Sequence, residues 1–198
     1  YYVWDCAAGT GNLLYGLTNK ENIFASTIES EDIIYMQSNE DLGMKKENVF
    51  QFDFLNDSFD KLPLKLKSII ENEEQRKRLI ILMNPPYIAS NVCLDRIGGD
   101  RISNCIIYKK YNKEYKEPNS INLFTLRLYI EIPGCHIFSL APVDYLFNRR
   151  RTFREKMGSK IKILFGVEAS IFEDIKSAFA INFSYVNEMN DISPLYGV

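Results

Sequence analysis

The chain has 198 residues and a mass of 23.0 kDa, which is the size of one domain and is enough to bury a sizeable hydrophobic core. Hydrophobic residues make up 46% and charged residues 25%, which excludes a disordered chain, a collagen-like repeat and a disulfide scaffold. The net charge of −2, the single histidine and four cysteines without a Cys-x-x-Cys pair argue against a nucleic-acid binder, a histidine-rich metal site and a serine–histidine hydrolase.

Short apolar runs of strand length alternate with stretches of helical pattern. In chain order, we expect strands at 1–4, 23–28, 49–52, 79–83, 136–140, 161–166 and 180–186, and helices at 12–18, 31–42, 59–78, 121–131 and 145–157. Apolar strands that alternate with helices are typical of a mostly parallel sheet with helices on both faces. The short gap between the last two strands permits a final antiparallel strand.

Residues 88–120 do not fit this alternation. They contain Gly98-Gly99, many polar residues and the run Tyr108-Lys109-Lys110-Tyr111, and we expect them to form an inserted loop. A loop of this length inside a compact α/β domain is usually functional. No apolar run approaches the roughly 18 residues that span a bilayer, and the separated cysteines are typical of a reducing, cytoplasmic setting.

The first predicted strand is followed by a glycine-rich turn, Asp5-Cys6-Ala7-Ala8-Gly9-Thr10-Gly11. A Gly-x-Gly pair between a strand and a helix allows positive φ angles and close approach of the backbone to a ligand. Leu14 stands where a dinucleotide fingerprint has a third small residue, and the lysine of a phosphate-binding P-loop is absent. By itself, this turn fits a ligand site and a purely structural turn equally well.

Acidic residues follow the next two predicted strands. Glu29 ends the second strand, where a carboxylate can accept hydrogen bonds from both hydroxyls of a ribose. Asp53 follows the third strand between Phe52 and Phe54, and this arrangement suits an adenine ring. Ligands of open α/β sheets bind at the carboxyl ends of the strands, so the order of these features favours a nucleotide-like ligand.

The fourth predicted strand leads into Asn84-Pro85-Pro86-Tyr87. Two consecutive prolines fix the backbone and remove two N–H donors, but their carbonyl groups remain. The side-chain oxygen of Asn84 and the carbonyl of Pro85 can together accept both hydrogens of one planar amino group. Tyr87 can stack on the ring that carries this amine.

The segments Asp5–Gly11, Glu29, Asp53 and Asn84–Tyr87, in this order, resemble the motifs of class I S-adenosylmethionine-dependent methyltransferases. The Asn-Pro-Pro-Tyr form is similar to that of enzymes that methylate adenine N6 in DNA, as in restriction–modification systems. The resemblance implies a Rossmann-like seven-stranded sheet with an antiparallel last strand. The implied cofactor is S-adenosyl-L-methionine, with Asp5, Ala7, Gly9 and Gly11 near its methionine part, Glu29 at the ribose, Asp53 and Phe54 at the adenine, and Asn84 close by. The implied catalytic residues, which hold the target amine, are Asn84, Pro85, Pro86 and Tyr87.

The resemblance also implies one catalytic domain over 1–198 that acts on a flipped adenine in DNA. In this subgroup a cofactor segment usually precedes the first strand and a target-recognition domain usually follows the last. Because neither is in the sequence, and because the chain starts inside an apolar run, we expect a fragment of a larger protein. Most DNA contacts, and a specificity or nuclease domain or subunit, would then lie outside it. Candidate backbone contacts within the chain are Lys109, Lys110, Lys113, Lys116 and Arg149–Arg151.

Other interpretations stay open at this point. Release-factor glutamine methyltransferases share the Asn-Pro-Pro-Tyr motif, because a side-chain amide presents a planar NH2 group as methyl acceptor, as an exocyclic amine does. An RNA amino-methyltransferase and a catalytically inactive scaffold of the same fold are further alternatives. We interpret His136 as a core or strand-end residue rather than a catalytic one, and Phe172–Asp174 as a possible border of the target pocket.

Overall fold

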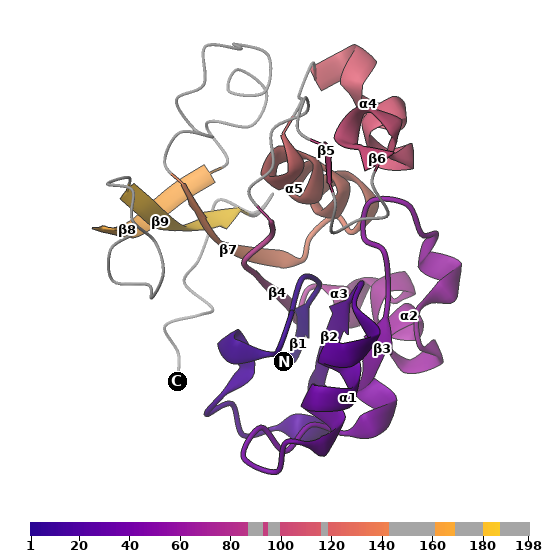
Figure 1. The fold of residues 1–198 in the computed structure, drawn as a ribbon, viewed down its shortest axis with the longest axis vertical. Helices are drawn as coiled ribbons and strands as arrows, with labels where there is room; N and C mark the ends of the chain where they lie inside the picture. The colour runs from indigo at the N-terminus through magenta and orange to yellow at the C-terminus, as the bar shows by residue number, and fades with distance from the viewer. Residues whose placement is uncertain (87–92, 95–99, 116–118, 143–160, 169–179, 187–198) are drawn as a thin grey trace.

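The computed structural model describes residues 1–86, 93–94, 100–115, 119–142, 161–168 and 180–186 (Figure 1). Several predicted features lie outside these residues: Tyr87, Lys116, Arg149–Arg151, Phe172–Asp174 and the helix at 145–157. No helix in the described part of the chain is both long and apolar enough to cross a membrane.

One sheet of seven strands organises the described residues. Its strands are β1 (Tyr2–Asp5), β2 (Ile23–Thr27), β3 (Val49–Gln51), β4 (Leu79–Met83), β7 (His136–Pro142), β8 (Ile161–Glu168) and β9 (Ala180–Val186). They lie in the order β3-β2-β1-β4-β7-β9-β8. Strands β1 to β4 and β7 pair in parallel, whereas β9 is antiparallel to both of its neighbours, β7 and β8. The predicted Rossmann-like sheet with an antiparallel last strand is therefore confirmed.

Helices cover the sheet on both faces. They are α1 (Ser30–Ser38), α2 (Leu64–Glu71), α3 (Glu73–Arg76), α4 (Ile106–Tyr115) and α5 (Ser120–Glu131) in the described part of the chain. Alternate residues of a strand point to opposite faces, and the two core clusters follow this rule. Phe24 of β2 belongs to the larger cluster, which includes residues of α2 and α5. Its neighbours Ile23 and Ala25 belong to the smaller cluster, which includes Met36 of α1.

Three predicted helices were wrong in extent. The helix predicted at 31–42 is α1, which ends at Ser38 because Asn39 is extended. The helix at 12–18 is only a 3₁₀ turn over Asn12–Leu14, because Gly11 and Gly16 on either side have φ angles of 83° and 76°. The helix at 59–78 is broken into a 3₁₀ turn, α2 and α3. Pro63 precedes α2, and Asn72 is extended between the two helices, where its side chain accepts a hydrogen bond from the backbone of Gln75.

The prediction of a loop over 88–120 was wrong for much of that range. The described residues there form a two-stranded antiparallel sheet, β5 (Cys93–Leu94) with β6 (Asp100–Arg101), and helix α4. The run Tyr108-Lys109-Lys110-Tyr111 makes the amphipathic pattern of this helix hard to recognise in the sequence. Ile107 and Tyr111 are buried one turn apart on α4, whereas Lys109 and Lys113 are exposed. Figure 1 shows α4 lying beside α5.

His136 is the first residue of β7 and is buried, as predicted. Its Nδ1 lies 2.8 Å from the hydroxyl of Tyr185 and its Nε2 lies 3.0 Å from the carbonyl oxygen of Lys77. Burial lowers the pKa of His136, partly offset by the hydrogen bond to Lys77. The neutral ring therefore joins β9 to the segment before β4, and this is a structural role.

Candidate active site

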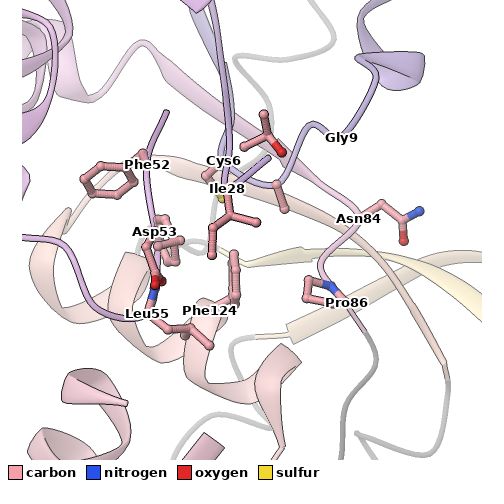
Figure 2. Close-up of a pocket in the computed structure, with 12 residues that line it drawn as sticks. Cys6, Gly9, Ile28, Phe52, Asp53, Leu55, Asn84, Pro86 and Phe124 are labelled. Atoms are coloured by element: carbon pink, nitrogen blue, oxygen red, sulfur yellow. The ribbon is translucent and has the colours of Figure 1, made fainter. Parts of the chain in front are cut away.

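A pocket of about 250 Å³ opens where the first four strands end (Figure 2). Its walls are Cys6, Ala7 and Gly9 after β1, Thr27 and Ile28 at the end of β2, Phe52 to Leu55 after β3, Asn84 and Pro86 after β4, and Phe124 of α5. Figure 2 shows Asn84 and Pro86 on one side of the pocket and Phe52 and Asp53 on the other. The carboxyl ends of parallel strands meet at one edge of a sheet, so residues distant in sequence share this cavity.

The glycine-rich turn after β1 needs both of its glycines, for different reasons. Gly9 lines the pocket with a φ of 51°, and a Cβ placed there would meet only Asp32 Oδ2, at 4.0 Å. Gly11 has a φ of 83°, and a Cβ there would lie 2.9 Å from Leu42 Cδ2 and 3.1 Å from Met36 Sδ. Gly9 therefore leaves room beside the cavity, whereas Gly11 allows close packing against the residues in and after α1.

Asp5 lies next to the pocket at the end of β1 and is only 1% exposed. Its Oδ1 accepts a hydrogen bond from the backbone N–H of Ala7 at 3.1 Å. Its buried Oδ2 has no hydrogen-bond partner among the described residues. Burial raises the pKa of Asp5 to about 7, although the Ala7 N–H opposes this rise. A buried oxygen without a donor, beside a cavity, is suited to a donor group or positive charge on a ligand.

Glu29 follows β2 and is the N-cap residue of α1, where its side chain makes no capping hydrogen bond, and it is exposed. It does not line the pocket, although its neighbour Ile28 does. Its backbone N–H lies 3.4 Å from Thr27 Oγ1, and this hydroxyl in turn lies 3.3 Å from Asp32 Oδ2. The structure thus brings a second carboxylate, Asp32, to the Gly9 side of the site, and the sequence analysis did not select it.

Asp53 lies in the pocket wall, and its carboxylate also organises the loop after β3. Its Oδ1 accepts from the backbone N–H groups of Leu55 and Asn56, at 3.0 and 3.1 Å, and its Oδ2 accepts from Asn56 Nδ2 at 2.8 Å. Its own backbone N–H donates to Asp57 Oδ2 at 2.8 Å. A carboxylate has about four acceptor positions, so one remains for a ligand donor.

Two aromatic rings, one of which the sequence analysis did not select, form part of the wall beside Asp53. Phe124 of α5 stacks on Phe54 with ring centroids 4.5 Å apart and an interplanar angle of 18°. Both rings are almost completely buried and both line the pocket. A flat apolar surface next to a carboxylate suits an aromatic heterocycle with an amino substituent. Position 124 carries no sequence signal for this role beyond its place on the apolar helix after the Asn-Pro-Pro motif.

The turn after β4 brings the Asn-Pro-Pro motif to the same cavity. Asn84 and Pro86 line the pocket and are exposed, whereas Pro85 is buried. Ser120, at the start of α5, donates a hydrogen bond from its hydroxyl to the carbonyl oxygen of Pro86. The position of this turn is therefore fixed by α5 as well as by β4.

The predicted site residues divide into two groups. Those that line the pocket are Ala7, Gly9, Asp53, Phe54, Asn84 and Pro86. The others in the described chain are Asp5, Gly11, Glu29 and Pro85, which lie outside the pocket wall. Three of these four adjoin a lining residue in sequence, and Gly11 packs against the side chains of Met36 and Leu42. No group of three or more histidine, cysteine or acidic side chains in the described residues is arranged to hold a metal ion.

Comparison with solved structures finds the same architecture in other proteins. The M protein of the type I restriction enzyme EcoKI matches with a TM-score of 0.57 and 14% identity over 96% of this chain. The type IIG restriction endonuclease BpuSI matches with a TM-score of 0.55 and 21% identity, also over 96%. A Listeria monocytogenes protein described as a class I S-adenosylmethionine-dependent methyltransferase matches with a TM-score of 0.51 and 16% identity over 96%.

These likenesses establish the fold, which is the Rossmann-like fold of class I methyltransferases. The aligned part is 40% of the EcoKI protein, 23% of BpuSI and 55% of the Listeria protein, so the chain spans less than two thirds of each. No protein-family model and no curated protein matches the chain.

Proposed function

We propose that the chain is the catalytic region of an S-adenosylmethionine-dependent methyltransferase that modifies the N6 amino group of adenine in DNA. The observation that carries this proposal is the convergence of Gly9, Asp53 and Asn84, from three different strand ends, on one pocket. The EcoKI and BpuSI proteins, which share the fold, are restriction enzymes by name, and this supports DNA as the substrate.

The residues in the pocket, and Asp5 directly next to it, fit the proposed cofactor. Asp5 Oδ2 is a buried acceptor without a partner among the described residues, and its proposed partner is a donor of the methionine part. The open space beside Gly9 accommodates a ligand next to the backbone. The stacked pair Phe54 and Phe124 offers an apolar wall for adenine, beside the carboxylate of Asp53. When bound, the cofactor supplies a methyl group that is already activated by its positively charged sulfur.

The chain's own contribution to the chemistry is to hold and orient the acceptor amine. The Asn84 side-chain oxygen and the Pro85 carbonyl oxygen are the acceptors for its two hydrogens. As positive charge develops on the nitrogen, these two oxygen dipoles stabilise it, and this is an electrostatic contribution to the rate. Fixing the amine at reacting distance supplies the rest. Neither task requires a strong base, which agrees with the structural role of His136.

Methyl transfer by the full-length protein tests the proposal directly. The protein is incubated with methyl-labelled cofactor and equal amounts of mixed-sequence duplex DNA, RNA and release factor, and the labelled product is identified by nucleoside and peptide analysis. Label in N6-methyladenine of DNA supports the proposal. Label in RNA or in a glutamine side chain keeps the chemistry at Asn84 and overturns the substrate. Absence of both cofactor binding and transfer favours the scaffold alternative.

A further inference from the structure

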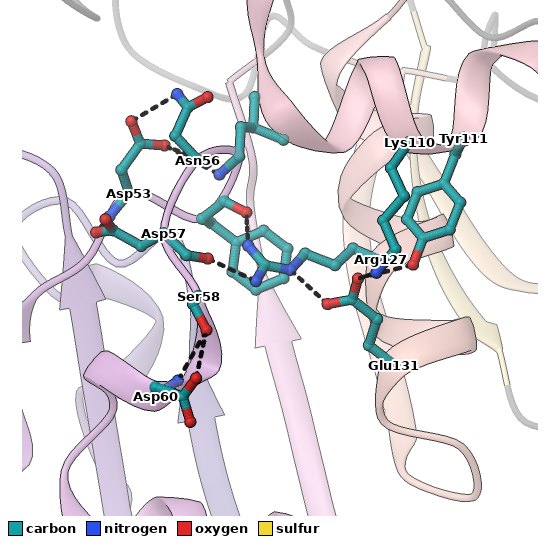
Figure 3. Close-up of polar contacts among 11 residues, drawn as sticks. Asp53, Asn56, Asp57, Ser58, Asp60, Lys110, Tyr111, Arg127 and Glu131 are labelled. Atoms are coloured by element: carbon teal, nitrogen blue, oxygen red, sulfur yellow. Dashed lines mark hydrogen bonds and ion pairs between the residues drawn. The ribbon is translucent and has the colours of Figure 1, made fainter.

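One face of α5 contacts two parts of the site, the loop after β3 and the turn after β4. Ser120, Phe124, Arg127 and Glu131 follow one another at intervals of three or four residues, so they lie on one side of the helix. Ser120 contacts the turn after β4, and Phe124 stacks on Phe54 in the loop after β3. Arg127 and Glu131 extend the same face beyond the pocket (Figure 3).

Arg127 is a charged residue on the buried part of α5, and it is only 3% exposed. Its guanidinium donates to the carbonyl oxygen of Phe54 and, at 2.7 Å, to the carbonyl oxygen of Asp57. It also lies over the Phe59 ring, 4.2 Å from its centroid. The Arg127 guanidinium thus binds two points of the loop that carries Asp53. It can do so because it is planar and provides several N–H donors at fixed angles.

The Arg127 contacts continue into the pocket wall through Asp57. Asp57 Oδ2 accepts the backbone N–H of Asp53, and the carboxylate of Asp53 in turn accepts the N–H groups of Leu55 and Asn56. Asp57 also forms an ion pair with Lys61, which helps to keep its pKa low despite the opposing effect of burial. The Asp53 carboxylate is therefore held in place by a series of hydrogen bonds that ends at Arg127.

Glu131 joins the same arrangement to α4. Its Oε2 accepts from Arg127 Nε at 2.9 Å, and its Oε1 accepts from Lys110 Nζ at 2.5 Å and the Tyr111 hydroxyl at 2.7 Å. Burial alone would raise the pKa of Glu131, but the hydrogen bonds from Lys110 and Tyr111 and the charge of Arg127 outweigh it and lower the pKa. The carboxylate is thus ionised and paired.

The first turn of α4 also forms hydrogen bonds with the loop after β3. The backbone N–H of Ile106 donates to Asn56 Oδ1 at 3.0 Å, and the N–H of Ile107 donates to the carbonyl oxygen of Leu55 at 3.2 Å. The loop is therefore held by α5 through Arg127 and by α4 through these two amides, and Glu131 connects the two helices. Figure 3 shows the polar side chains of this network between the loop, α4 and α5.

We propose that this face of α5 sets the position of the Asp53 loop relative to the Asn-Pro-Pro turn, with Arg127 as the positioning residue for the loop and Ser120 as the positioning residue for the turn. This inference rests on the proposed function, because it assigns the loop to the cofactor and the turn to the target amine. It predicts that the two residues control different steps: Arg127 controls cofactor affinity, and Ser120 controls the rate of transfer.

The experiment compares Arg127→Met and Ser120→Ala with a matched control, Arg76→Met, in the full-length protein. Arg76 also donates to two carbonyl oxygens, those of Pro133 and Ile70, both at 2.7 Å, but it precedes β4 at the opposite edge of the sheet. Cofactor affinity is measured by calorimetry and methyl transfer by single-turnover kinetics, well below the melting temperature of each variant. Arg127→Lys, which keeps the charge but loses the planar fork, is the conservative variant.

We expect Arg127→Met to weaken cofactor binding by about tenfold or more, because charged hydrogen bonds to two carbonyls are lost, and Arg127→Lys to recover part of the loss. Ser120→Ala should leave affinity within about twofold and lower the transfer rate, since the hydroxyl that it removes donates to the carbonyl oxygen of Pro86 in the turn. Arg76→Met should change neither quantity. Equal effects of Arg127→Met and Arg76→Met on affinity would overturn the inference.

A second measurement needs no cofactor and therefore separates this inference from the proposed function. Amide hydrogen exchange in Arg127→Met should accelerate at Leu55, Asn56 and Asp57 while the strands of the sheet stay protected. Uniform acceleration over the whole chain would show a general stabilising role and overturn the inference. If the wild-type protein binds no cofactor but the local acceleration is observed, the proposed function fails and the positioning of the loop by Arg127 stands.

Discussion

Phe124 stacks on Phe54 across the junction between α5 and the loop after β3, with their ring centroids 4.5 Å apart. The pair belongs to the main hydrophobic core and to the pocket wall at the same time. Any ligand in this pocket therefore contacts side chains whose positions are determined by core packing. Stability and binding are coupled at these two residues.

Substitution of Phe124 tests this coupling. Phe124→Ala should lower the free energy of unfolding by about 3–5 kcal/mol, as is usual for removal of a buried ring. Phe124→Leu should cost less, since it keeps most of the volume. Both variants should bind cofactor more weakly than wild type at a temperature where they are fully folded. Urea unfolding followed by circular dichroism and calorimetric titration measure the two effects, and unchanged affinity in Phe124→Leu would remove Phe124 from the binding site.

Asp5 should make stability depend on pH. Its pKa is about 7 in the folded chain, raised by burial, against about 3.9 in an unfolded chain. Between these values the folded state binds more protons than the unfolded state, so stability decreases as the pH rises from about 4 to 7 and then levels off. The cost at pH 8 is on the order of 4 kcal/mol.

Asp5→Asn isolates this contribution. The amide keeps an acceptor for the Ala7 N–H and does not ionise, so the variant should be more stable than wild type at pH 8 and comparable at pH 4. The difference between the two unfolding free energies, measured in urea at several pH values, should grow between these limits. A difference independent of pH would contradict the assignment. Cofactor binding by Asp5→Asn should weaken, because the variant loses the charge that we propose to complement the methionine part.

Gly11 should be sensitive to substitution for reasons of packing. Gly11→Ala places a methyl group 2.9 Å from Leu42 Cδ2 at a φ of 83°, so backbone strain and steric overlap add, and we expect a loss of about 2–4 kcal/mol. Gly16→Ala is the matched control, because Gly16 has a φ of 76° and nothing within 4 Å of its Cβ position. It should lose only about 1–2 kcal/mol. Thermal unfolding of both variants measures the difference in stability. Equal losses of stability would show that Leu42 and Met36 move away from the added methyl group without a measurable loss of stability.

Asn84 should separate binding from chemistry. Asn84→Ala is expected to abolish methyl transfer while cofactor affinity stays within about threefold of wild type, because the side chain is exposed and its proposed partner is the target amine. Asn84→Asp retains an acceptor oxygen in the same position and should retain residual transfer. Filter binding of labelled cofactor and transfer to DNA are measured on the same preparations. Equal loss of both activities in Asn84→Ala would overturn the role assigned to the residue.

The strand ends of this fold could be predicted from sequence, because apolar strands are followed directly by polar or glycine-rich turns. Gly9, Asp53 and Asn84 share one pocket for the simple reason that β1, β3 and β4 are parallel and end at the same edge. No tertiary information is needed for that inference once the strands are located. The predicted strand at 79–83 agrees with β4 residue for residue.

The contribution of the helices could not be predicted in the same way. α4 is amphipathic, but tyrosines form part of its buried face and alternate with lysines, so the pattern becomes clear only from the burial of Ile107 and Tyr111. Arg127 reaches Phe54 and Asp57 across some seventy positions of sequence, a distance over which local patterns carry no information. One signal was present: Arg127 and Glu131 are charged residues four positions apart at the end of an apolar helix, a spacing typical of an ion pair.

The order of the strands has a consequence for synthesis of the protein. β9 lies between β7 and β8, although it follows both in the chain. During translation β8 emerges without a neighbour in the sheet, and β7 presents a free edge until Ala180–Val186 leave the ribosome. A chain that stops before residue 180 would keep most of the pocket wall but expose the unpaired edge of β7, and such a product should aggregate. Pairing of β9 with β7 and β8 therefore completes the sheet of the described residues.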